Sequence, residues 1–260
     1  MTPPTHIKDA VGNMSSFAKE VGQKKNILVV GGGAVGTEFA AEIKAFYKDT
    51  RVVLLHNEKA PLTNVYSDKF RLALKKKLEA MGVQYVGGER LANAAEASST
   101  HKEGESVKTE SGLVIKSIDL IIASIGPQQR NSEFVAVGKD PTGLMNVSST
   151  FQLKAEGWSN VFAIGDIARV EGFENEVRQL GKYDKHASVA AGNIVKLIQK
   201  APLQAYTGAV EIIAVALGPK EGYGWANLFG GMRLPSFLIT PLKSKDLLRK
   251  FVADRFRAAA

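Results

Sequence analysis

The sequence predicts an α/β protein organised around a buried parallel sheet, and three adjacent observations lead to that class. Residues 26–30 form an apolar run rich in branched aliphatic side chains, which is typical of a strand buried on both faces. Gly31, Gly33 and Gly36 follow in G-x-G-x-x-G spacing, and residues 34–47 have the pattern of a helix. A buried strand, a glycine turn and a helix in this order predict a Rossmann-like unit.

Each glycine of this turn has its own expected role. Gly31 makes the tight turn, Gly33 lets the backbone approach a pyrophosphate, and Gly36 lets the helix pack close to the strand. The free N–H groups and partial positive charge of the helix N-terminus favour a phosphate there. The alternative is a glycine turn with a structural role only. The candidate cofactor-binding residues of this loop are Gly31, Gly32, Gly33, Ala34, Val35 and Gly36.

The second strand is predicted at residues 51–55, and the residues after it bear on which nicotinamide cofactor binds. In a Rossmann unit an acidic residue at the end of this strand binds the ribose 2′-hydroxyl. His56 occupies that place here, followed by Asn57 and Glu58. A histidine does not replace the carboxylate and tolerates a 2′-phosphate, so we expect NADPH preference or little discrimination between NADH and NADPH. In the alternative interpretation, Glu58 binds the ribose and His56 is a solvated turn residue.

Shorter patterns predict the rest of the first sheet. Residues 67–81 have the spacing of a helix with a charged outer face, ended by Gly82. The polar stretch 89–112 is interpreted as hairpin connections with a mobile tip near residues 100–106. The last predicted strand ends at Gly126-Pro127, and Gly126 is a candidate cofactor-binding residue. Strands are expected at residues 83–86, 113–115 and 120–125.

A second candidate site lies further along the chain. Residues 159–166 predict a short buried strand that ends at Gly165 and Asp166. Ligands of open α/β sheets bind at the carboxyl ends of the strands, where Asp166 would suit a sugar or ribityl hydroxyl. The alternative is that this turn is only a helix N-cap. A helix is expected at residues 186–200, capped by Asp184 or an adjacent residue.

The two ends of the chain have weaker patterns. Residues 6–21 have weak helical spacing and are interpreted as the approach to a domain. Residues 207–218 are strand-like, and residues 221–231 are interpreted as a turn region rich in glycine and aromatic residues. Residues 243–257 alternate apolar and basic side chains as in a basic amphipathic helix. This helix either docks on the protein's own core or makes a peripheral membrane contact.

Composition restricts the classes of function. The chain has no cysteine, which excludes disulfides, thiolate metal sites and redox-active dithiols, and we expect no metal site. The net charge of +8 favours acidic partners, although nothing in the sequence suggests nucleic acid. We see neither a membrane-spanning run nor a signal peptide, and therefore expect a cytoplasmic protein, with a membrane-peripheral or mitochondrion-associated position as the alternative.

Several motifs in one order resemble those of a known family. They are VVGGGAVGTEFA at residues 29–40, IIASIGP at 121–127, NVFAIGD at 160–166, AGNI at 191–194, PLQAY at 202–206 and LKSKDL at 242–247. The chain resembles the pyridine-nucleotide flavin oxidoreductases, closest to the ferroptosis-suppressor-like (apoptosis-inducing-factor-2-like) NAD(P)H:quinone oxidoreductases. The resemblance implies that Gly31, Gly33 and Gly36 bind NAD(P)H. It also implies that Glu38 is a candidate catalytic residue where nicotinamide meets flavin, and that Gly165 and Asp166 face FAD.

The resemblance also implies a domain organisation. We expect an approach segment at residues 1–25, an NAD(P)-binding Rossmann domain at 26–126, a partial FAD-binding domain at 127–200 and a small C-terminal α+β segment at 201–260. Because only residues 1–25 precede the first strand, we expect a truncated member that lacks the N-terminal FAD fingerprint.

The predicted function is an FAD-dependent NAD(P)H oxidoreductase that passes electrons to a quinone-like acceptor. The alternative is a non-catalytic dinucleotide-binding remnant or an interaction module that does not hold FAD. A short-chain dehydrogenase is set aside, because no tyrosine of the chain is followed four residues later by a lysine. The sequence leaves open a homo-oligomer, and it does not identify the acceptor.

Overall fold

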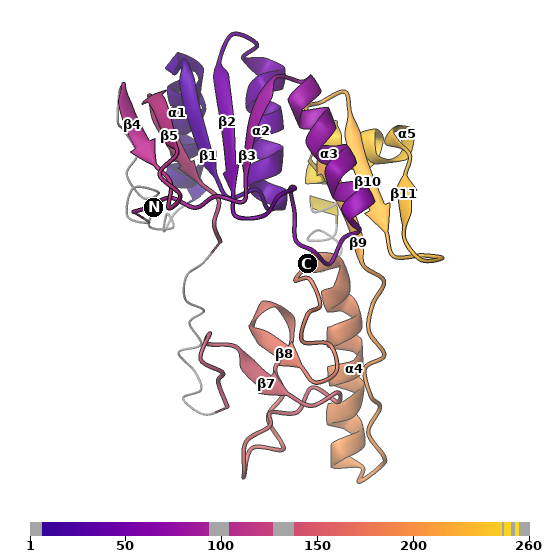
Figure 1. The fold of residues 1–260 in the computed structure, drawn as a ribbon. Helices are drawn as coiled ribbons and strands as arrows, with labels where there is room; N and C mark the ends of the chain where they lie inside the picture. Colours follow the sequence, from indigo (N-terminus) through magenta and orange to yellow (C-terminus); the bar gives the residue numbers. More distant parts are fainter. Residues whose placement is uncertain (1–6, 94–103, 127–137, 246, 251–252, 255–260) are drawn as a thin grey trace. The chain divides into compact units, whose positions relative to one another are not determined.

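The computed structural model describes residues 7–93, 104–126, 138–245, 247–250 and 253–254 (Figure 1). The chain divides into two compact units, which are described separately below. The first unit combines Met1–Gly126 with Ile212–Ala260, and the second is Pro127–Glu211. These units group residues 212–260 with the N-terminal part of the chain, and they place residues 201–211 in the second unit. The division into nicotinamide and flavin domains stays a prediction.

The centre of the first unit is a four-stranded sheet in the order β3-β2-β1-β6. All of its neighbouring strands are parallel. The strands are β1 (Asn26–Val30), β2 (Arg51–His56), β3 (Val83–Gly87) and β6 (Leu120–Ala123). Four consecutive residues of β1 and of β2 are buried, as expected of strands covered on both faces. The strand order reverses between β1 and β6, and this switch point is where such sheets bind ligands.

Two helices connect these strands as the sequence predicts: α2 (Ala34–Phe46) lies between β1 and β2, and α3 (Asp68–Ala80) lies between β2 and β3. Helix α1 (Ile7–Gln23) precedes β1. Helix α2 buries its small residues, Gly36, Ala40 and Ala41, and therefore lies close to the sheet. Gly82 follows the C-cap of α3 with φ of +91°, which confirms its predicted role as the residue that ends the helix.

The antiparallel pair β4 (Glu105–Lys108) and β5 (Val114–Ile118) follows β3 in the chain. Val107 and Ile115 of this hairpin share one buried cluster with Leu28 and Val53 of the parallel sheet. A hairpin is present in the predicted region, but its turn lies at residues 109–113, and Glu105 and Ser106 of the predicted tip belong to β4. Residues 100–103 of the predicted tip lie outside the described residues.

A second, antiparallel sheet of the first unit corrects one prediction. Its order is β11-β10-β9, with β9 at Ile212–Ala216, β10 at Gly222–Ala226 and β11 at Met232–Leu234. The glycine-aromatic stretch predicted as a turn contains β10, and all five residues of that strand are buried. A Cβ on Gly222 or Gly224 would lie 2.5 or 2.6 Å from Ile239, so only glycine fits on that face. Tyr223 and Trp225 point to the other face.

The end of the chain differs from the predicted continuous amphipathic helix. Helix α5 spans Ser236–Ile239 and leads into a single π-turn, η3, at Thr240–Ser244. Leu247 and Leu248 have φ of +53° and +63°, which interrupts any helix from 243 to 257. Residues 255–257 lie outside the described part of the chain. No helix among the described residues has both the length and the apolar character needed to cross a bilayer.

The second unit is built on the parallel pair β7 (Met145–Val147) and β8 (Ala168–Val170), with the 3₁₀ turn η2 (Gly165–Ile167) and helix α4 (Leu180–Ile198). Its core surrounds Phe151, which is fully buried. The strand predicted before Gly165 is wrong, because only one bridge, between Gln152 and Phe162, forms there. The predicted cap is also wrong: α4 begins at Leu180 after Gln179, so Asp184 lies inside the helix.

Candidate dinucleotide-binding site

The turn between β1 and α2 is shaped by two glycines that touch their neighbours. Gly31 has φ of +103°, and a Cβ on it would lie 2.4 Å from the carbonyl oxygen of Ser124. A Cβ on Gly36 would lie 1.9 Å from the carbonyl oxygen of Gly31. Both contacts are with backbone atoms, which cannot move aside as a side chain can. Gly31 and Gly36 therefore have the structural roles predicted for them.

Gly33 differs because it faces open space. It is the N-cap of α2, has φ of −65° and makes no side-chain cap hydrogen bond, and a Cβ on it would meet no atom within 4 Å. The first N–H of the helix to bond within it is that of Thr37, which donates to Gly33 O at 3.0 Å. The N–H groups of Ala34, Val35 and Gly36 precede that bond. An open backbone and free helix N–H groups fit the pyrophosphate of a dinucleotide.

His56 braces this loop from β2. Gly32 N–H donates to His56 Nδ1 at 3.1 Å, and His56 Nε2 lies 3.4 Å from Leu62 O. This pattern requires a proton on Nε2 and none on Nδ1. Burial lowers the pKa of His56, although the Leu62 carbonyl opposes that shift, so the ring is neutral at pH 7. His56 is half-buried and is not a solvated turn residue.

Glu58 is held by a buried arginine. Arg71 donates to Glu58 Oε2 at 3.0 Å and to Asp68 Oδ1 at 3.1 Å. The same guanidinium donates to the backbone carbonyls of Pro61, Ala60 and Leu62. Arg71 therefore fixes the segment between β2 and α3 and neutralises Glu58. A direct contact from Glu58 or His56 to a ribose stays a prediction.

The end of β6 completes the loop. Ser124 N–H donates to Val30 O at 2.7 Å, because β6 runs parallel to β1 and ends at the same edge. Ser124 Oγ is buried and has no hydrogen-bond partner among the described residues. Gly126 follows with φ of +73°, and a Cβ on it would meet nothing within 4 Å. Ser124 was not predicted as a site residue, although it belongs to the recognised motif at residues 121–127.

Glu38 lies on α2, five residues after Gly33, and pairs with the C-terminal part of the unit. Its Oε1 atom lies 2.5 Å from Lys243 Nζ and accepts the N–H of Ala216 at 3.0 Å. Lys243 also donates to Ala214 O at 2.7 Å. Glu38 therefore joins α2 to β9 and η3. Sequence reasoning did not predict Lys243 as its partner, although the recognised motif at residues 242–247 contains it.

Glu38 also lines an apolar cavity of about 400 Å³ between α1 and α2. Most of its lining is aromatic or aliphatic, and Phe17 and Phe39 meet edge to face across it at 6.3 Å. Glu42 contributes the other carboxyl group, and its Oε1 atom is buried with no hydrogen-bond partner among the described residues. Burial, followed by the charge of Glu38, raises the pKa of Glu42.

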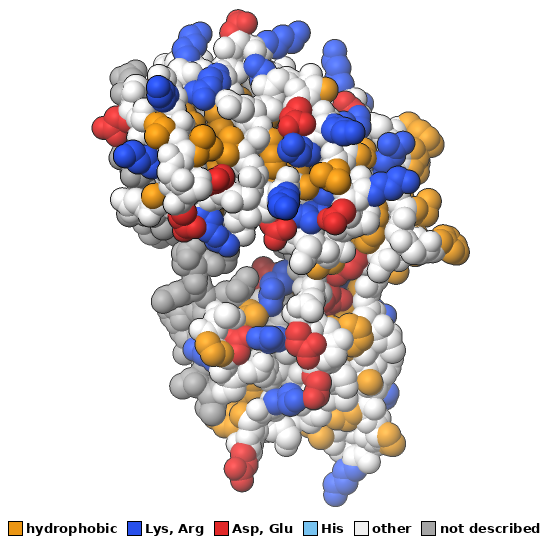
Figure 2. Space-filling view, viewed as in Figure 1, with side chains coloured by type: hydrophobic (Ala, Val, Ile, Leu, Met, Phe, Trp, Pro, Cys, Tyr) orange, Lys and Arg blue, Asp and Glu red, His pale blue; other side chains and the backbone are white. Residues whose placement is uncertain are grey.

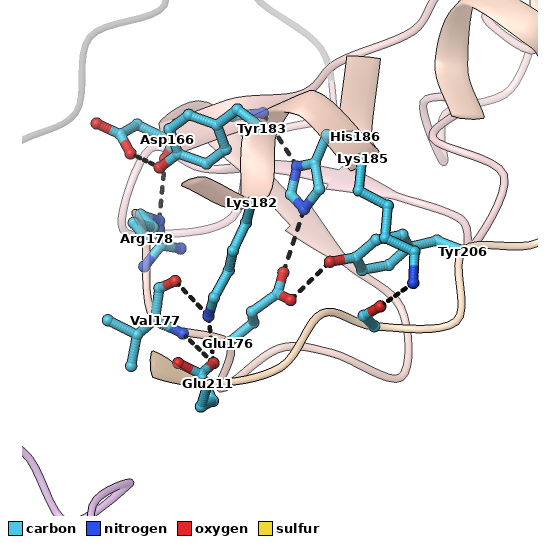
Figure 3. Close-up of polar contacts among 12 residues, drawn as sticks. Asp166, Glu176, Val177, Arg178, Lys182, Tyr183, Lys185, His186, Tyr206 and Glu211 are labelled. Atoms are coloured by element: carbon cyan, nitrogen blue, oxygen red, sulfur yellow. Dashed lines mark hydrogen bonds and ion pairs between the residues drawn. The ribbon is translucent and has the colours of Figure 1, made fainter. Parts of the chain in front are cut away.

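Gly165 and Asp166 lie in the second unit, in the 3₁₀ turn η2 (Figure 3). Asp166 is exposed, accepts the hydroxyl of Tyr183 at Oδ1, and its carbonyl accepts Arg178 Nε at 3.0 Å. The turn has no side-chain cap bond, so the N-cap interpretation is not supported. Gly165 has φ of +75° and open space where a Cβ would stand. An exposed carboxylate beside an open glycine fits a hydroxyl-bearing ligand, such as the ribityl chain of a flavin.

Behind that turn lies a buried polar group that was not predicted. His186 accepts from Gly165 N–H at 3.4 Å, and its Nε2 lies 3.2 Å from Glu176 Oε2. Tyr206 donates to the other oxygen of Glu176 at 2.7 Å. Lys182 and Glu211 form a second buried pair nearby, and Figure 3 shows the labelled residues of both groups. No cluster of three or more acidic or histidine side chains in the described part of the chain is arranged to hold a metal.

Comparisons with known proteins agree with this geometry. The family model described as pyridine nucleotide-disulphide oxidoreductase matches residues 5–205. An FAD-dependent oxidoreductase of Flammulina velutipes is 32% identical over 94% of this chain and 74% of its own length. Ferroptosis suppressor protein 1 of Homo sapiens is 30% identical over 92% of this chain, which spans 62% of that protein.

Solved structures support the fold. A ferredoxin reductase from Rhodopseudomonas palustris superposes with a TM-score of 0.62 over 84% of this chain and 51% of its own, at 18% identity. At that identity the likeness shows the Rossmann-like fold and nothing finer. The family match covers most of the chain and includes the glycine loop. The chain therefore belongs to the pyridine nucleotide-disulphide oxidoreductase family.

Proposed function

We propose that the protein is an FAD-dependent NAD(P)H oxidoreductase that passes electrons to a quinone-like acceptor. The observation that carries the proposal is the open backbone at Gly33, in front of a helix N-terminus with unbonded N–H groups. Membership of an oxidoreductase family and a relative named as an FAD-dependent oxidoreductase support it. Without cysteine, the chain has no dithiol to act as the acceptor.

The chain's own residues would bind and orient the cofactors. The N–H groups of Ala34, Val35 and Gly36 would hold the pyrophosphate of NAD(P)H, and His56 would keep the loop in place. Asp166 would accept hydroxyl groups of the flavin. When bound, the flavin supplies the chemistry for taking a hydride and passing electrons on, singly or in pairs.

Glu38 and Lys243 are the proposed proton carriers. Reduction of a quinone to a hydroquinone takes up two electrons and two protons. Glu38 Oε1 and Lys243 Nζ lie 2.5 Å apart in a charge-assisted hydrogen bond, and the proposal is that this pair delivers the protons. Each of the two side chains is about one-fifth exposed, which leaves a path from solvent for reprotonation.

We also propose that the site accepts both NADH and NADPH. His56 is neutral, and Glu58 is neutralised by Arg71, so neither repels a 2′-phosphate. Arg90 is exposed and close enough to His56 to influence its pKa. That guanidinium would suit a 2′-phosphate.

One observation favours the second candidate function, a dinucleotide-binding protein without flavin. FAD and NAD(P)H each carry a pyrophosphate, and each usually occupies its own glycine loop. Among the described residues, one loop, at residues 31–36, combines a strand, a glycine turn and a helix N-terminus. The residues of the second unit fit the flavin only at its hydroxyl groups.

Absorbance spectroscopy separates the two functions. The purified protein is mixed with FAD and desalted, and NADH or NADPH is then added without oxygen. A retained band near ~450 nm that bleaches with nucleotide and returns on adding a short-chain quinone supports the enzyme. Uptake of NAD(P)H without any flavin supports the second function and overturns the first. In the enzyme, Gly33→Ala should raise the nucleotide concentration needed for bleaching about ten-fold to a hundred-fold. Glu38→Gln should slow quinone reduction while flavin bleaching continues.

A further inference from the structure

The cavity between α1 and α2 offers a small molecule an apolar site to which the proposed reaction assigns no ligand. Its volume of about 400 Å³ lies in the range of pockets that hold small molecules. Phe39 and Phe46 on its lining are 37% and 66% exposed, so the cavity opens to solvent. Its aromatic lining residues come from both helices and from the residue after α2, and they are Phe17, Phe39, Phe46 and Tyr47. All of these residues belong to the first unit.

Direct contacts between the two helices fix the walls of the cavity. Phe17 of α1 and Phe39 of α2 meet edge to face at 6.3 Å between ring centroids. A Cβ on Gly22 would lie 3.1 Å from the hydroxyl oxygen of Tyr47, so the absence of a side chain lets Tyr47 pack tightly on α1. Because these contacts are already made, a ligand does not have to order the walls as it binds.

Glu42 brings a negative charge into this apolar lining. It lies four residues after Glu38, so both carboxyl groups project from one face of α2. Burial, followed by the charge of Glu38, raises the pKa of Glu42, and a hydrogen bond from the Gly218 backbone only partly opposes that shift. Lys243 neutralises Glu38, whereas no ion pair of Glu42 is found in the described part of the chain. The ionised Glu42 carboxylate therefore lacks a cationic partner among the described residues.

The chemistry of the lining selects one class of ligand. Aromatic and aliphatic walls favour an apolar body, whose burial removes apolar surface from water. The Glu42 carboxylate favours a positive charge, because Coulomb attraction strengthens where apolar walls exclude water. The faces of the aromatic rings attract the same charge. One charge is enough, since Lys243 already neutralises Glu38.

We propose that this cavity binds a hydrophobic monoamine, whose ammonium group pairs with the Glu42 carboxylate while its apolar body packs on the aromatic side chains of α1 and α2. An alcohol of the same shape brings no charge to the carboxylate, and an anion is repelled by it. Pairing with an ammonium group offsets the cost of ionising a buried carboxyl group, so the ligand should also stabilise the fold. The proposal depends neither on NAD(P)H nor on FAD.

Calorimetric titration of the full chain with three probes of similar shape tests the charge preference. The probes are phenylbutylamine, phenylbutanol and phenylbutyrate, and salt at about 0.15 M screens surface charges. We expect the amine to bind about ten-fold more tightly than the alcohol, because a hydrogen bond to a charged group is the stronger one. The carboxylate probe should bind more weakly than both.

The surface charge of the protein makes this order diagnostic. The net charge of the chain is +8, and Figure 2 shows Lys and Arg side chains spread over the visible face of the first unit. Non-specific attraction to that surface would favour the carboxylate probe over the amine. A preference for the amine therefore points to a local carboxylate.

Three variants assign the preference to Glu42 and to the cavity. Glu42→Gln keeps the size of the side chain and removes its charge, so the amine should lose about ten-fold in affinity and bind like the alcohol. Glu79→Gln is the matched control, because Glu79 lies on α3, pairs with Lys75 at 3.0 Å and does not line the cavity. It should bind all three probes as the natural chain does. Ala18 is exposed on α1 and lines the cavity, so the ring of Ala18→Phe should weaken binding of every probe.

Thermal melting protects the test against misfolding. The amine should raise the Tm of the natural chain and of Glu79→Gln, and it should raise that of Glu42→Gln much less. No binding of the amine by the natural chain, or equal binding of the amine and the alcohol, overturns the proposal. So does a Glu42→Gln variant that binds the amine as tightly as the natural chain. Unchanged amine affinity in a folded Ala18→Phe variant places the site outside the cavity and overturns it too.

Discussion

An added methyl group should have different effects at two glycines of one loop: at one it should weaken ligand binding, and at the other it should destabilise the fold. Gly33 and Gly36 are three residues apart, at the start of α2. A Cβ on Gly33 meets no protein atom within 4 Å, whereas a Cβ on Gly36 would lie 1.9 Å from a backbone oxygen. Gly33→Ala should therefore affect the ligand, and Gly36→Ala should affect the fold.

The magnitudes follow from these contacts. Alanine is a poorer N-cap than glycine, but it also restricts the unfolded chain, so Gly33→Ala should change the free energy of unfolding by less than about 1 kcal/mol. The methyl group takes the place of a phosphate oxygen and removes one or two charge-assisted hydrogen bonds, which weakens NADH binding about ten-fold to a hundred-fold. Gly36→Ala overpacks a rigid contact and should cost about 3 kcal/mol.

Thermal melting and NADH titration of the purified variants measure both effects. Gly36→Ala should lower the Tm by about 6–12 °C, at about 2–4 °C per kcal/mol. Gly12→Ala is the control, because Gly12 lies in α1 with open space at its Cβ and is not part of the loop. It should melt no lower than the natural chain and bind NADH equally well. Unchanged NADH affinity in a folded Gly33→Ala variant would refute the assignment of the loop to the pyrophosphate.

Three further predictions concern charge. His56→Asp places a carboxylate at the end of β2, so the ratio of NADPH to NADH affinity should fall about ten-fold, as two titrations would show. Burial raises the pKa of Glu42 above its ordinary value of 4.5, so the ionised carboxylate destabilises the fold. As pH rises above 4.5, Glu42→Gln should therefore become more stable relative to the natural chain. Urea unfolding of both proteins from about pH 4 to 8 measures this difference. Burial raises the pKa of Asp140, but hydrogen bonds from Thr142 and Arg169 outweigh it and hold that pKa well below its usual range. Asp140→Asn should therefore destabilise the second unit by about 1–3 kcal/mol at pH 7, and the difference should shrink as pH falls below the ordinary range of aspartate, by the same unfolding assay.

Local patterns predicted the parts of the fold that local forces determine. Strand β1 and helix α2 follow from an apolar run, three spaced glycines and a helical pattern, which all lie within residues 26–46. Gly82 ends α3 because a glycine adopts positive φ without strain. This property belongs to the residue type and can therefore be predicted from the sequence.

The missed elements depend on partners far away in the chain. Gly222 and Gly224 are strand residues because Ile239 fills the space beside them, and Tyr223 stacks on Phe70 of α3 at 4.9 Å. Viewed alone, that stretch has the composition of a turn. Helix α4 starts earlier than predicted for the same reason: Lys182 is buried in its first turn and paired with Glu211.

The candidate site divides in the same way. The roles of Gly31 and Gly36 were predictable, because the spacing encodes a local turn. The bond from Gly32 N–H to His56 was not, because it depends on the rotamer of a side chain from another strand. The pairing of Glu38 with Lys243 joins residues 205 positions apart, which only the folded chain brings together.

The hydrogen bonds and close contacts that shape the glycine loop come from residues of the first unit. Gly31 is held by Leu55 and Ser124, and Gly32 is held by His56, Leu62 and Thr37. None of these residues belongs to the second unit. Nucleotide binding should therefore persist whether or not FAD is present, and it is common to both proposed functions. Asp166→Asn separates them, because it should weaken FAD uptake and leave NADH affinity unchanged if the flavin binds as proposed. A protein whose NADH affinity falls with Asp166→Asn would contradict the independence of the loop.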